Sequence, residues 1–262
     1  MLTLVRQDIP GVVPYCGPPP SPEAWLGRWN LDPILLAVTG GAVLVGIWLW
    51  RSRKDRTRAM AQKGIVGTAI LLFLFISPFC ALTTALFSGR VAHHILMVAL
   101  AAPLLAGFLR PFTPVSVLVA PGVAATLKAG VFWLWHIPPL YIAAYDLPGV
   151  YWAMQTSLLA AALLFWASVC VAARVAPLSV LLALLATVIQ MGLLGALLTF
   201  APAALYLPHI ATTPLWGLSP LEDQQLGGAL MWVPGALPYF IAAVALVLAR
   251  PYRPPLREGK LQ

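Results

Sequence analysis

Long apolar stretches separated by short polar segments dominate the sequence from Asp32 almost to its C-terminus. A helix needs about 20 consecutive apolar residues to cross the hydrocarbon core of a bilayer. By this measure the pattern predicts seven transmembrane helices, over Asp32–Trp50, Gly64–Phe87, Ala92–Leu109, Val115–Ile137, Val150–Ala173, Leu178–Ala201 and Leu226–Ala249. None of these stretches alternates as a transmembrane strand does, so we expect an all-α integral membrane fold.

The polar flanks divide the chain into three parts. Residues 1–30 are predicted to form a proline-rich N-terminal tail, residues 31–250 the seven-helix membrane domain, and residues 251–262 a basic C-terminal tail. No internal repeat or separate soluble domain interrupts this pattern. One membrane domain therefore accounts for most of the chain.

The last predicted helix carries several local signals. Ser219 and Glu222 have the spacing of a capping box, with Pro220 at the first helical position, and Asp223 is expected to help cap the same helix. The glycine pair at 227–228 permits close helix approach. Proline and glycine at positions 234, 235 and 238 predict a kinked or broken helix.

Composition agrees with a polytopic membrane protein. The chain of 262 residues is 61% hydrophobic and 9% charged, whereas soluble domains are about 45–50% apolar and about 25% charged. This excludes an ordinary cytosolic enzyme and a disordered chain. The first thirty residues lack the apolar core of a secretory signal. The three cysteines, Cys16, Cys80 and Cys170, are widely spaced, so the sequence indicates neither a disulfide framework nor a zinc site.

The basic residues predict the orientation. If the loop after the first span is cytoplasmic, twelve basic residues lie inside and three, Arg6, Arg28 and Arg90, lie outside. The N-terminus is then periplasmic and the C-terminus cytoplasmic. The net charge of +8 reflects this topology, and no interleaved aromatic and basic residues suggest nucleic-acid binding.

All four histidines fall on the predicted outer side. His93 and His94 open the third span, and Met97 shares a helix face with them. Imidazole and thioether groups suit copper, with thioether favouring Cu(I). His136 ends the fourth span, between aromatic residues and a proline pair that stops the helix. The alternatives are that the adjacent histidines are polar anchors at the membrane interface and that His136 makes one hydrogen bond to a loop.

Lys128 is the one basic residue predicted deep within a span, about 12 Å below His136. A charge there is costly, so we expect Lys128 to face the bundle and to find a partner. Cys16 and Cys80 lie on the outer side, where each is either a soft ligand or inert.

Three segments resemble one family. HILMVALAAPLL (94–105), FWLWHIPPLYIAAY (132–145) and WGLSPLEDQQLGGALMWVPG (216–235) are similar to the caa3-type cytochrome c oxidase assembly factors of the CtaG family. The resemblance implies a multi-pass protein of the bacterial inner membrane that helps to mature haem-copper oxidase, through its copper centre. The resemblance implies histidines at positions 90, 94, 151 and 155 and in the WHIPP turn; this chain keeps His94 and His136 and has Arg90, Tyr151 and Gln155 at the other three positions.

These observations predict an assembly factor that interacts with oxidase subunits in the lipid bilayer and is not an enzyme. Its candidate site is a copper site of His94 and His136, supported by His93 and Met97. It would pass Cu(I) onward or hold an oxidase subunit open while copper enters. The alternatives are a structural subunit or a haem-binding subunit of a respiratory complex, with haem held by two histidines. A transporter is less consistent with a single deep ionisable residue.

Overall fold

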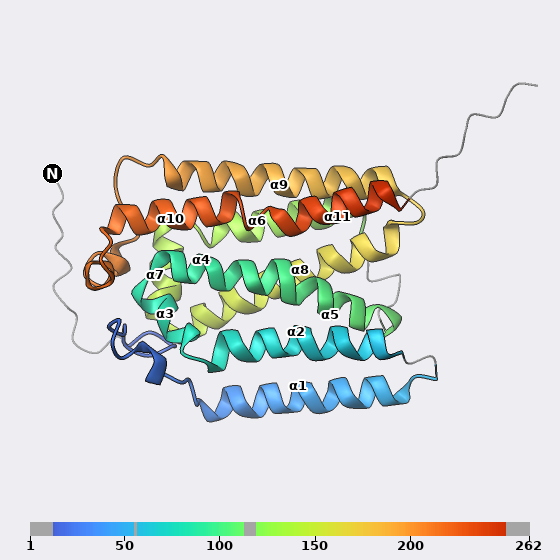
Figure 1. Ribbon diagram of the computed structural model, residues 1–262, viewed down its shortest axis with the longest axis horizontal. Coiled ribbons are helices and arrows are strands. Elements are labelled where there is room, and N and C mark those ends of the chain that lie inside the picture. Colours follow the sequence, from blue (N-terminus) through green and yellow to red (C-terminus); the bar gives the residue numbers. More distant parts are fainter. Residues whose placement is uncertain (1–12, 55–56, 113–118, 250–262) are drawn as a thin grey trace, which may run out of the picture.

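The computed structural model describes residues 13–54, 57–112 and 119–249, and the described part contains helices and no strand. The predicted basic tail, 251–262, lies outside these residues. The helices run roughly parallel or antiparallel in one layered bundle (Figure 1). Their bounds are α1 Pro33–Ser52, α2 Arg58–Ile76, α3 Phe79–Ala85, α4 Phe87–Ile95, α5 Ala102–Leu109, α6 Pro121–Leu134, α7 Pro138–Asp146, α8 Pro148–Ala172, α9 Pro177–Thr199, α10 Pro220–Trp232 and α11 Leu237–Leu248.

Six helical stretches among the described residues are long and apolar enough to cross a membrane. They correspond to six of the seven predicted spans. The remaining one corresponds to α6, whose 14 residues extend about 21 Å, less than the ~30 Å hydrocarbon core. The helical fold class is thus confirmed, and the count of seven spans stays a prediction.

Two predicted boundaries near the histidines are wrong. The second span does not continue to Phe87, because α2 ends at Ile76 and Ser77–Pro78 separates it from the short helix α3. The third span begins at Phe87, five residues earlier than predicted. His93 and His94 therefore lie in the second turn of a buried helix, where they cannot act as polar anchors at the membrane interface.

The last predicted span is broken, as its prolines and glycine indicated. Residues 233–236 separate α10 from α11, and the amide of Gly235 donates to the Leu230 carbonyl at 2.8 Å. The capping box is also confirmed: Ser219 Oγ accepts from the Glu222 amide, and the Glu222 carboxylate accepts from the Ser219 amide. The break tilts α11 away from the line of α10 (Figure 1).

Basic and histidine-bearing segments lie at opposite ends of the bundle. One end gathers the C-terminal ends of α1, α5 and α8 and the N-terminal end of α2, close to Arg51, Arg110, Arg174 and Arg58. The other end gathers α3, α7 and the segment 200–219 (Figure 1). The predicted separation of cations from histidines is therefore present in the fold.

The N-terminal segment packs onto the histidine end of the bundle. A disulfide joins Cys16 to Cys80 in α3, which corrects the expectation that the cysteines are unpaired. Spacing along the chain gave no signal, since the two cysteines are 64 residues apart and meet only in the folded protein. Tyr15 stacks on Tyr151 of α8 with ring centroids 4.9 Å apart. The backbone amide of Asn30 donates to the Ile76 carbonyl. Residues 13–30 thus cover the histidine end of the bundle.

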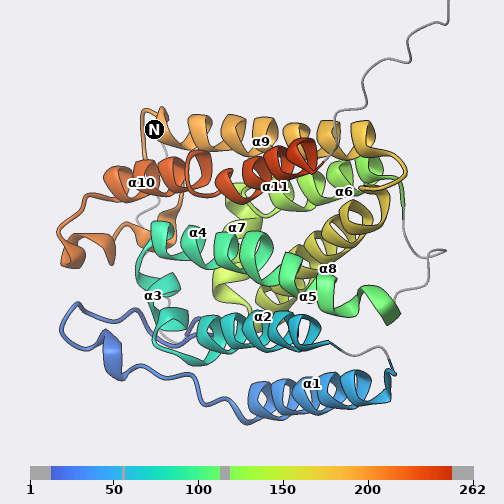
Figure 2. The ribbon, with the colours of Figure 1, turned by 45° about the vertical axis from the view of Figure 1, so that its right-hand side comes forward.

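Helix α1 is the least embedded element. Only Leu35 among its residues is buried, and both views place the helix at the edge of the bundle (Figures 1 and 2). Its apolar side chains face outward, as expected for a helix surrounded by lipid. The core lies instead between α2, α4, α5, α8, α9 and α10, where the fully buried side chains Leu74, Met97, Met154, Leu184 and Met231 are found.

Close packing of α10 depends on its glycine pair. A Cβ at Gly228 would stand 2.6 Å from the Gly195 carbonyl oxygen of α9, and one at Gly227 would stand 2.5 Å from the Phe87 ring. Backbone atoms cannot yield as a flexible side chain can. These contacts confirm the predicted close approach of α10 to two neighbouring helices.

We expect Gly228→Ala to destabilise the protein by about 1–3 kcal/mol, because the added methyl group forces α9 and α10 apart. Gly130→Ala in α6 is the matched control, since a Cβ there meets nothing within 4 Å. Thermal unfolding of the purified proteins in detergent measures both. Equal midpoints for the two variants would show that the α9–α10 contact is not tight.

Candidate functional site

Helix α4 begins at a buried carboxylate contributed by α10. Asp223, fully buried, accepts a hydrogen bond from the Phe87 amide at 2.6 Å and from the Ser88 amide at 3.1 Å, and the Ser88 hydroxyl also donates to it. A carboxylate at a helix N-terminus satisfies free amides and complements the helix dipole. Asp223 therefore stands in the first turn of α10, as expected, but its carboxylate caps α4.

A widened turn follows the histidines on the same helix. Residues Leu96–Ala101 form a π-helical turn, in which the Ala102 amide donates to Met97. Pro103 has no amide to continue the α-helical pattern to Ala99. The displaced Val98 carbonyl accepts instead from Trp166 Nε1 of α8 at 3.0 Å. This bond fixes the register of α4 against α8, and with it the position of the residues that face each other.

Six buried polar residues meet between α4, α8 and the turn after α6. We call them the polar centre: Arg90, His93, His94, His136, Tyr151 and Gln155. His94 lies within electrostatic range of Arg90, His93 and His136, and its ring interacts with the Gln155 amide. Tyr151 in turn interacts with Gln155 and Arg90. The positions 90, 94, 151 and 155 thus converge in the fold.

Arg90 carries a permanent charge in this centre. Its side chain is 2% exposed, and Nε and Nη1 have no hydrogen-bond partner among the described residues. The guanidinium carbon lies 4.7 Å from the Tyr141 ring centroid and 5.3 Å from that of Tyr145. Such contacts contribute about 0.5–2 kcal/mol each, against several kcal/mol for removing the ion from water. The aromatic rings therefore offset only part of the cost of burying Arg90.

The imidazoles of α4 differ in their surroundings. His93 is edge-on to Phe75, with ring centroids 5.0 Å apart, and stacks on Phe79 at 6.2 Å. Neither nitrogen of His93 has a hydrogen-bond partner, and His94 Nε2 also lacks one. Met97 is fully buried one turn further along the helix. His93 is thus enclosed by aromatic rings, whereas His94 faces the middle of the polar centre.

His136 is held by the helix that precedes it. Its Nδ1 lies 2.7 Å from the Phe132 carbonyl, which fixes a tautomer with the proton on Nδ1 and a lone pair on Nε2. The His136 carbonyl accepts from Tyr206 at 3.0 Å. The ring of His136 thus bonds to the preceding helix and not to a loop, which corrects the alternative interpretation. This bond leaves Nε2 able to act as a ligand, an orientation that metal-binding histidines commonly have.

His209 belongs to a neighbouring cluster in the segment between α9 and α10. Its Nε2 lies 2.6 Å from the Tyr141 hydroxyl. The pKa of His209 is lowered from 6.5 to about 3, mostly by burial; the nearby charge of Arg90 adds to the shift, and the Ala85 backbone opposes it. His209 is therefore neutral at pH 7, and its Nε2 shares one hydrogen bond with the Tyr141 hydroxyl.

Copper does not fit the polar centre as a resident ion. Within the described ranges no three His, Cys, Asp or Glu side chains gather as metal ligands. Of the sequence-predicted set, His94 lies within electrostatic range of His93 and His136, but these three imidazoles do not gather as ligands of one ion. A monovalent cation about 6 Å from Arg90 would be destabilised by about 3 kcal/mol at an effective dielectric constant of about 20. Arginine in this position therefore opposes stable metal binding.

Lys128 lies apart from this centre. Its Nζ has no hydrogen-bond partner among the described residues and stands 4.6 Å from the Tyr239 ring centroid and 5.6 Å from that of Phe165. Lys128 does face the bundle, as predicted. Its partners are aromatic faces of α8 and α11, which no charge pattern in the sequence reveals.

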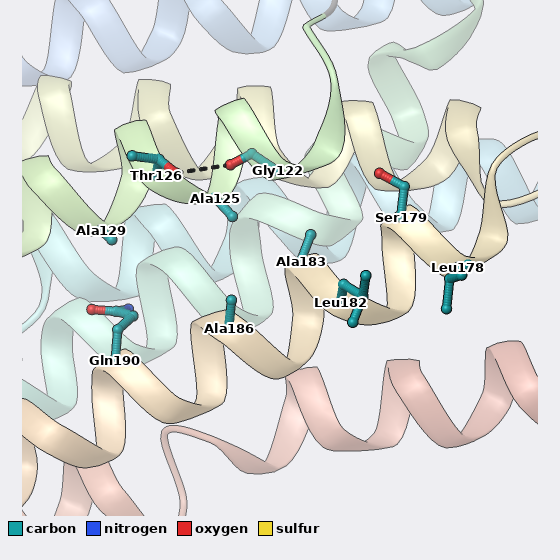
Figure 3. Close-up of a pocket in the computed structure, with 10 residues that line it drawn as sticks. All are labelled: Gly122, Ala125, Thr126, Ala129, Leu178, Ser179, Leu182, Ala183, Ala186 and Gln190. Atoms are coloured by element: carbon teal, nitrogen blue, oxygen red, sulfur yellow. Dashed lines mark hydrogen bonds between the residues drawn. The ribbon is translucent and has the colours of Figure 1, made fainter.

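A groove of about 660 Å³ opens between α6 and α9. Figure 3 shows small and apolar side chains along it, and the polar groups lining it are Thr126, Ser179 and Gln190. None of its lining residues is titratable. The groove therefore offers no chemistry comparable with that of the polar centre.

Several residues of the site have no local signal in the sequence. In the sequence, Arg90 is one of three basic residues on the predicted outer side. Gln155 is a single polar residue within an apolar helix. Asp223 satisfies a capping pattern in its own helix while its carboxylate binds another. Only the resemblance described above marks positions 90, 151 and 155 as a group, because it implies histidines at these three positions.

A family model described as cytochrome c oxidase caa3 assembly factor matches residues 41–251, which is most of the chain and includes the whole polar centre. No curated protein matches the sequence, and no solved structure matches it either. The family match agrees with the resemblance of the three segments around 94–105, 132–145 and 216–235.

Asp223→Ala should destabilise the protein by about 3 kcal/mol, because it leaves buried amides of α4 without an acceptor. Glu222→Ala is the matched control one residue away. Glu222 caps an exposed helix end, so its loss should cost about 1 kcal/mol or less. Thermal unfolding in detergent compares the two. A larger loss for Glu222→Ala would contradict the assignment of Asp223 to α4.

Because His209 is buried and neutral, we expect the protein to lose stability in acid. The unfolded chain takes up a proton on His209 below about pH 6.5, whereas the folded protein resists protonation there until about pH 3. Stability therefore falls as the pH drops through this range, by up to about 1.4 kcal/mol per pH unit from this residue. His209→Gln keeps an acceptor for Tyr141 and removes the titration. Its unfolding midpoint should change less between pH 7 and pH 5 than that of the wild type; parallel curves would be inconsistent with a neutral, buried His209.

Proposed function

This chain belongs to the family of cytochrome c oxidase caa3 assembly factors, and from that premise we propose that it assists maturation of the copper centre of a haem-copper oxidase in the bacterial inner membrane. It acts at the histidine end of the bundle by holding an oxidase subunit in an accessible conformation. No bond-making step is required of it, so we do not propose that it is an enzyme.

We place the histidine end on the periplasmic side. The basic segments between the helices gather at the other end, as the positive-inside rule requires of a cytoplasmic face. The Cys16–Cys80 disulfide lies at the histidine end, and disulfides persist in oxidising compartments such as the periplasm. Two independent features, charge and cysteine pairing, thus support the same orientation.

The subunit-holding role rests on one observation. A permanently charged guanidinium, that of Arg90, occupies the centre in which metal ligands would be expected. Tyr151 and Gln155 add a hydroxyl and an amide, which are weak ligands for Cu(I). The chain matches the family model over most of its length, while the resemblance implies histidines where this chain has Arg90, Tyr151 and Gln155; this favours docking over copper storage.

A second candidate function is the transfer of copper as cargo. His94 Nε2 is buried without a partner, and the Phe132 carbonyl orients His136 so that its Nε2 is free to bind. Cu(I) accepts few ligands and suits imidazole, with buried Met97 as a further soft donor. The positive charge of Arg90 repels Cu(I), which argues against this candidate.

The decisive experiment is deletion of the gene followed by complementation, with haem and copper measured in the membrane oxidase. We expect the deletion strain to contain less copper in its oxidase. The His94→Ala, His136→Ala double variant should restore that copper if the protein holds a subunit, because no copper passes through these side chains. The same variant should fail if the protein carries Cu(I).

Controls separate these outcomes from misfolding. Immunoblotting of membranes must show the double variant at the wild-type level, and the purified wild type should retain far less than one copper ion per molecule after exposure to Cu(I) and desalting. An oxidase that is fully metallated in the deletion strain would refute the assembly role in copper maturation. A Soret band in the purified protein would instead support the haem-binding alternative.

A further inference from the structure

The charge of Arg90 has no counter-ion among the described residues. Asp223 lies on a neighbouring helix, but both of its carboxylate oxygens accept from the N-terminal turn of α4, and one also accepts from Thr213. Asp32 caps α1, and Glu222 caps α10. The guanidinium nitrogens Nε and Nη1 donate to no described residue, and so to no described carboxylate.

Other donors without partners lie beside this charge. His93 has no partner on either nitrogen, and an imidazole in any protonation state carries at least one N–H. Arg90 also lies in the first turn of α4, where the helix dipole favours negative charge and opposes a cation. The local field and the unsatisfied donors thus both call for a negatively charged acceptor.

From these contacts we propose that the polar centre binds a small monovalent anion beside Arg90. Arg90 supplies the charge and two donor nitrogens, Nε and Nη1, and the imidazoles of His93 and His94 supply the adjoining polar wall. The aromatic rings of Tyr141 and Tyr145 contact the guanidinium but offer its N–H groups no in-plane acceptor. The anion completes the hydrogen bonding that the protein leaves open.

Burial limits the size of this ligand. His93 is fully buried, and Arg90, Tyr151 and Gln155 are each at most 3% exposed. The N-terminal segment covers this end, since Tyr15 stacks on Tyr151 and the Cys16 sulfur lies 3.5 Å from the Tyr151 hydroxyl. A chloride ion or a carboxylate the size of formate suits such an enclosed place, whereas a protein side chain or a lipid headgroup cannot reach it.

Anion-dependent stability tests the proposal on the full chain in detergent. Thermal unfolding is measured in sodium chloride, bromide or formate against sodium gluconate of equal ionic strength, because gluconate is too large for the centre. A ligand that binds only the folded protein raises the unfolding midpoint with its concentration and saturates. We expect a saturable rise of several degrees for the wild type with at least one of the small anions.

Arg90→Gln should abolish this rise, because it removes the charge and keeps a polar side chain. Lys128→Gln is the matched control, since Lys128 is the other buried cation with unpartnered nitrogen in the described structure. It should retain the full anion-dependent rise. Equal midpoints in chloride, formate and gluconate for the wild type, or a rise that persists in Arg90→Gln, would overturn the proposal and leave buried water as the partner of Arg90.

Direct measurement covers the case in which Arg90→Gln does not fold. Wild-type protein equilibrated with bromide and desalted into gluconate should retain about one bromide per molecule by elemental analysis, displaceable by chloride. Retention of none, together with no rise in the midpoint, refutes the proposal. Neither readout involves oxidase maturation, so the outcome is independent of the proposed function.

Discussion

The cap that Asp223 provides for α4 is the interaction on which the histidine end depends. It ties the first turn of α4 to α10, so that the charged and imidazole side chains of α4 are presented at a fixed height in the bundle. The glycines of α10 let this contact form, because any Cβ at position 227 would collide with Phe87. In a low-dielectric interior, a carboxylate bound by three donors holds two helices together more firmly than apolar packing alone.

The second fixed point is the bond from Trp166 to the Val98 carbonyl. It exists because Pro103 interrupts the regular hydrogen bonding of the third span and frees a carbonyl group in the π-helical turn. Helix α10 holds α4 at one end, and α8 holds the same span in its middle. These two contacts bring His94 next to Gln155. Hydrogen bonds to backbone groups thus form a rigid frame. This frame positions the polar centre, in which several side-chain nitrogens lack hydrogen-bond partners.

That incomplete pairing connects the proposals made for this protein. A guanidinium with open N–H groups repels copper and attracts an anion, so the same residue argues for docking without a resident metal and for a bound counter-ion. The disulfide and the stacked tyrosines close the centre from the outside. Both proposals therefore depend on the residue at position 90.

The sequence by itself determined the helical membrane class, six of the spanning stretches, the capping box at Ser219, the break after Trp232 and the family, because each follows from local composition, spacing or motif. It also separated the basic segments from the histidines, since charge bias is read along the chain. The tertiary structure alone decided that Cys16 bonds Cys80, that Asp223 caps α4, that His93 is enclosed by aromatic rings, and that Arg90, Tyr151 and Gln155 converge on His94. These relations join residues far apart in sequence, and their energies arise only when burial removes the competing water.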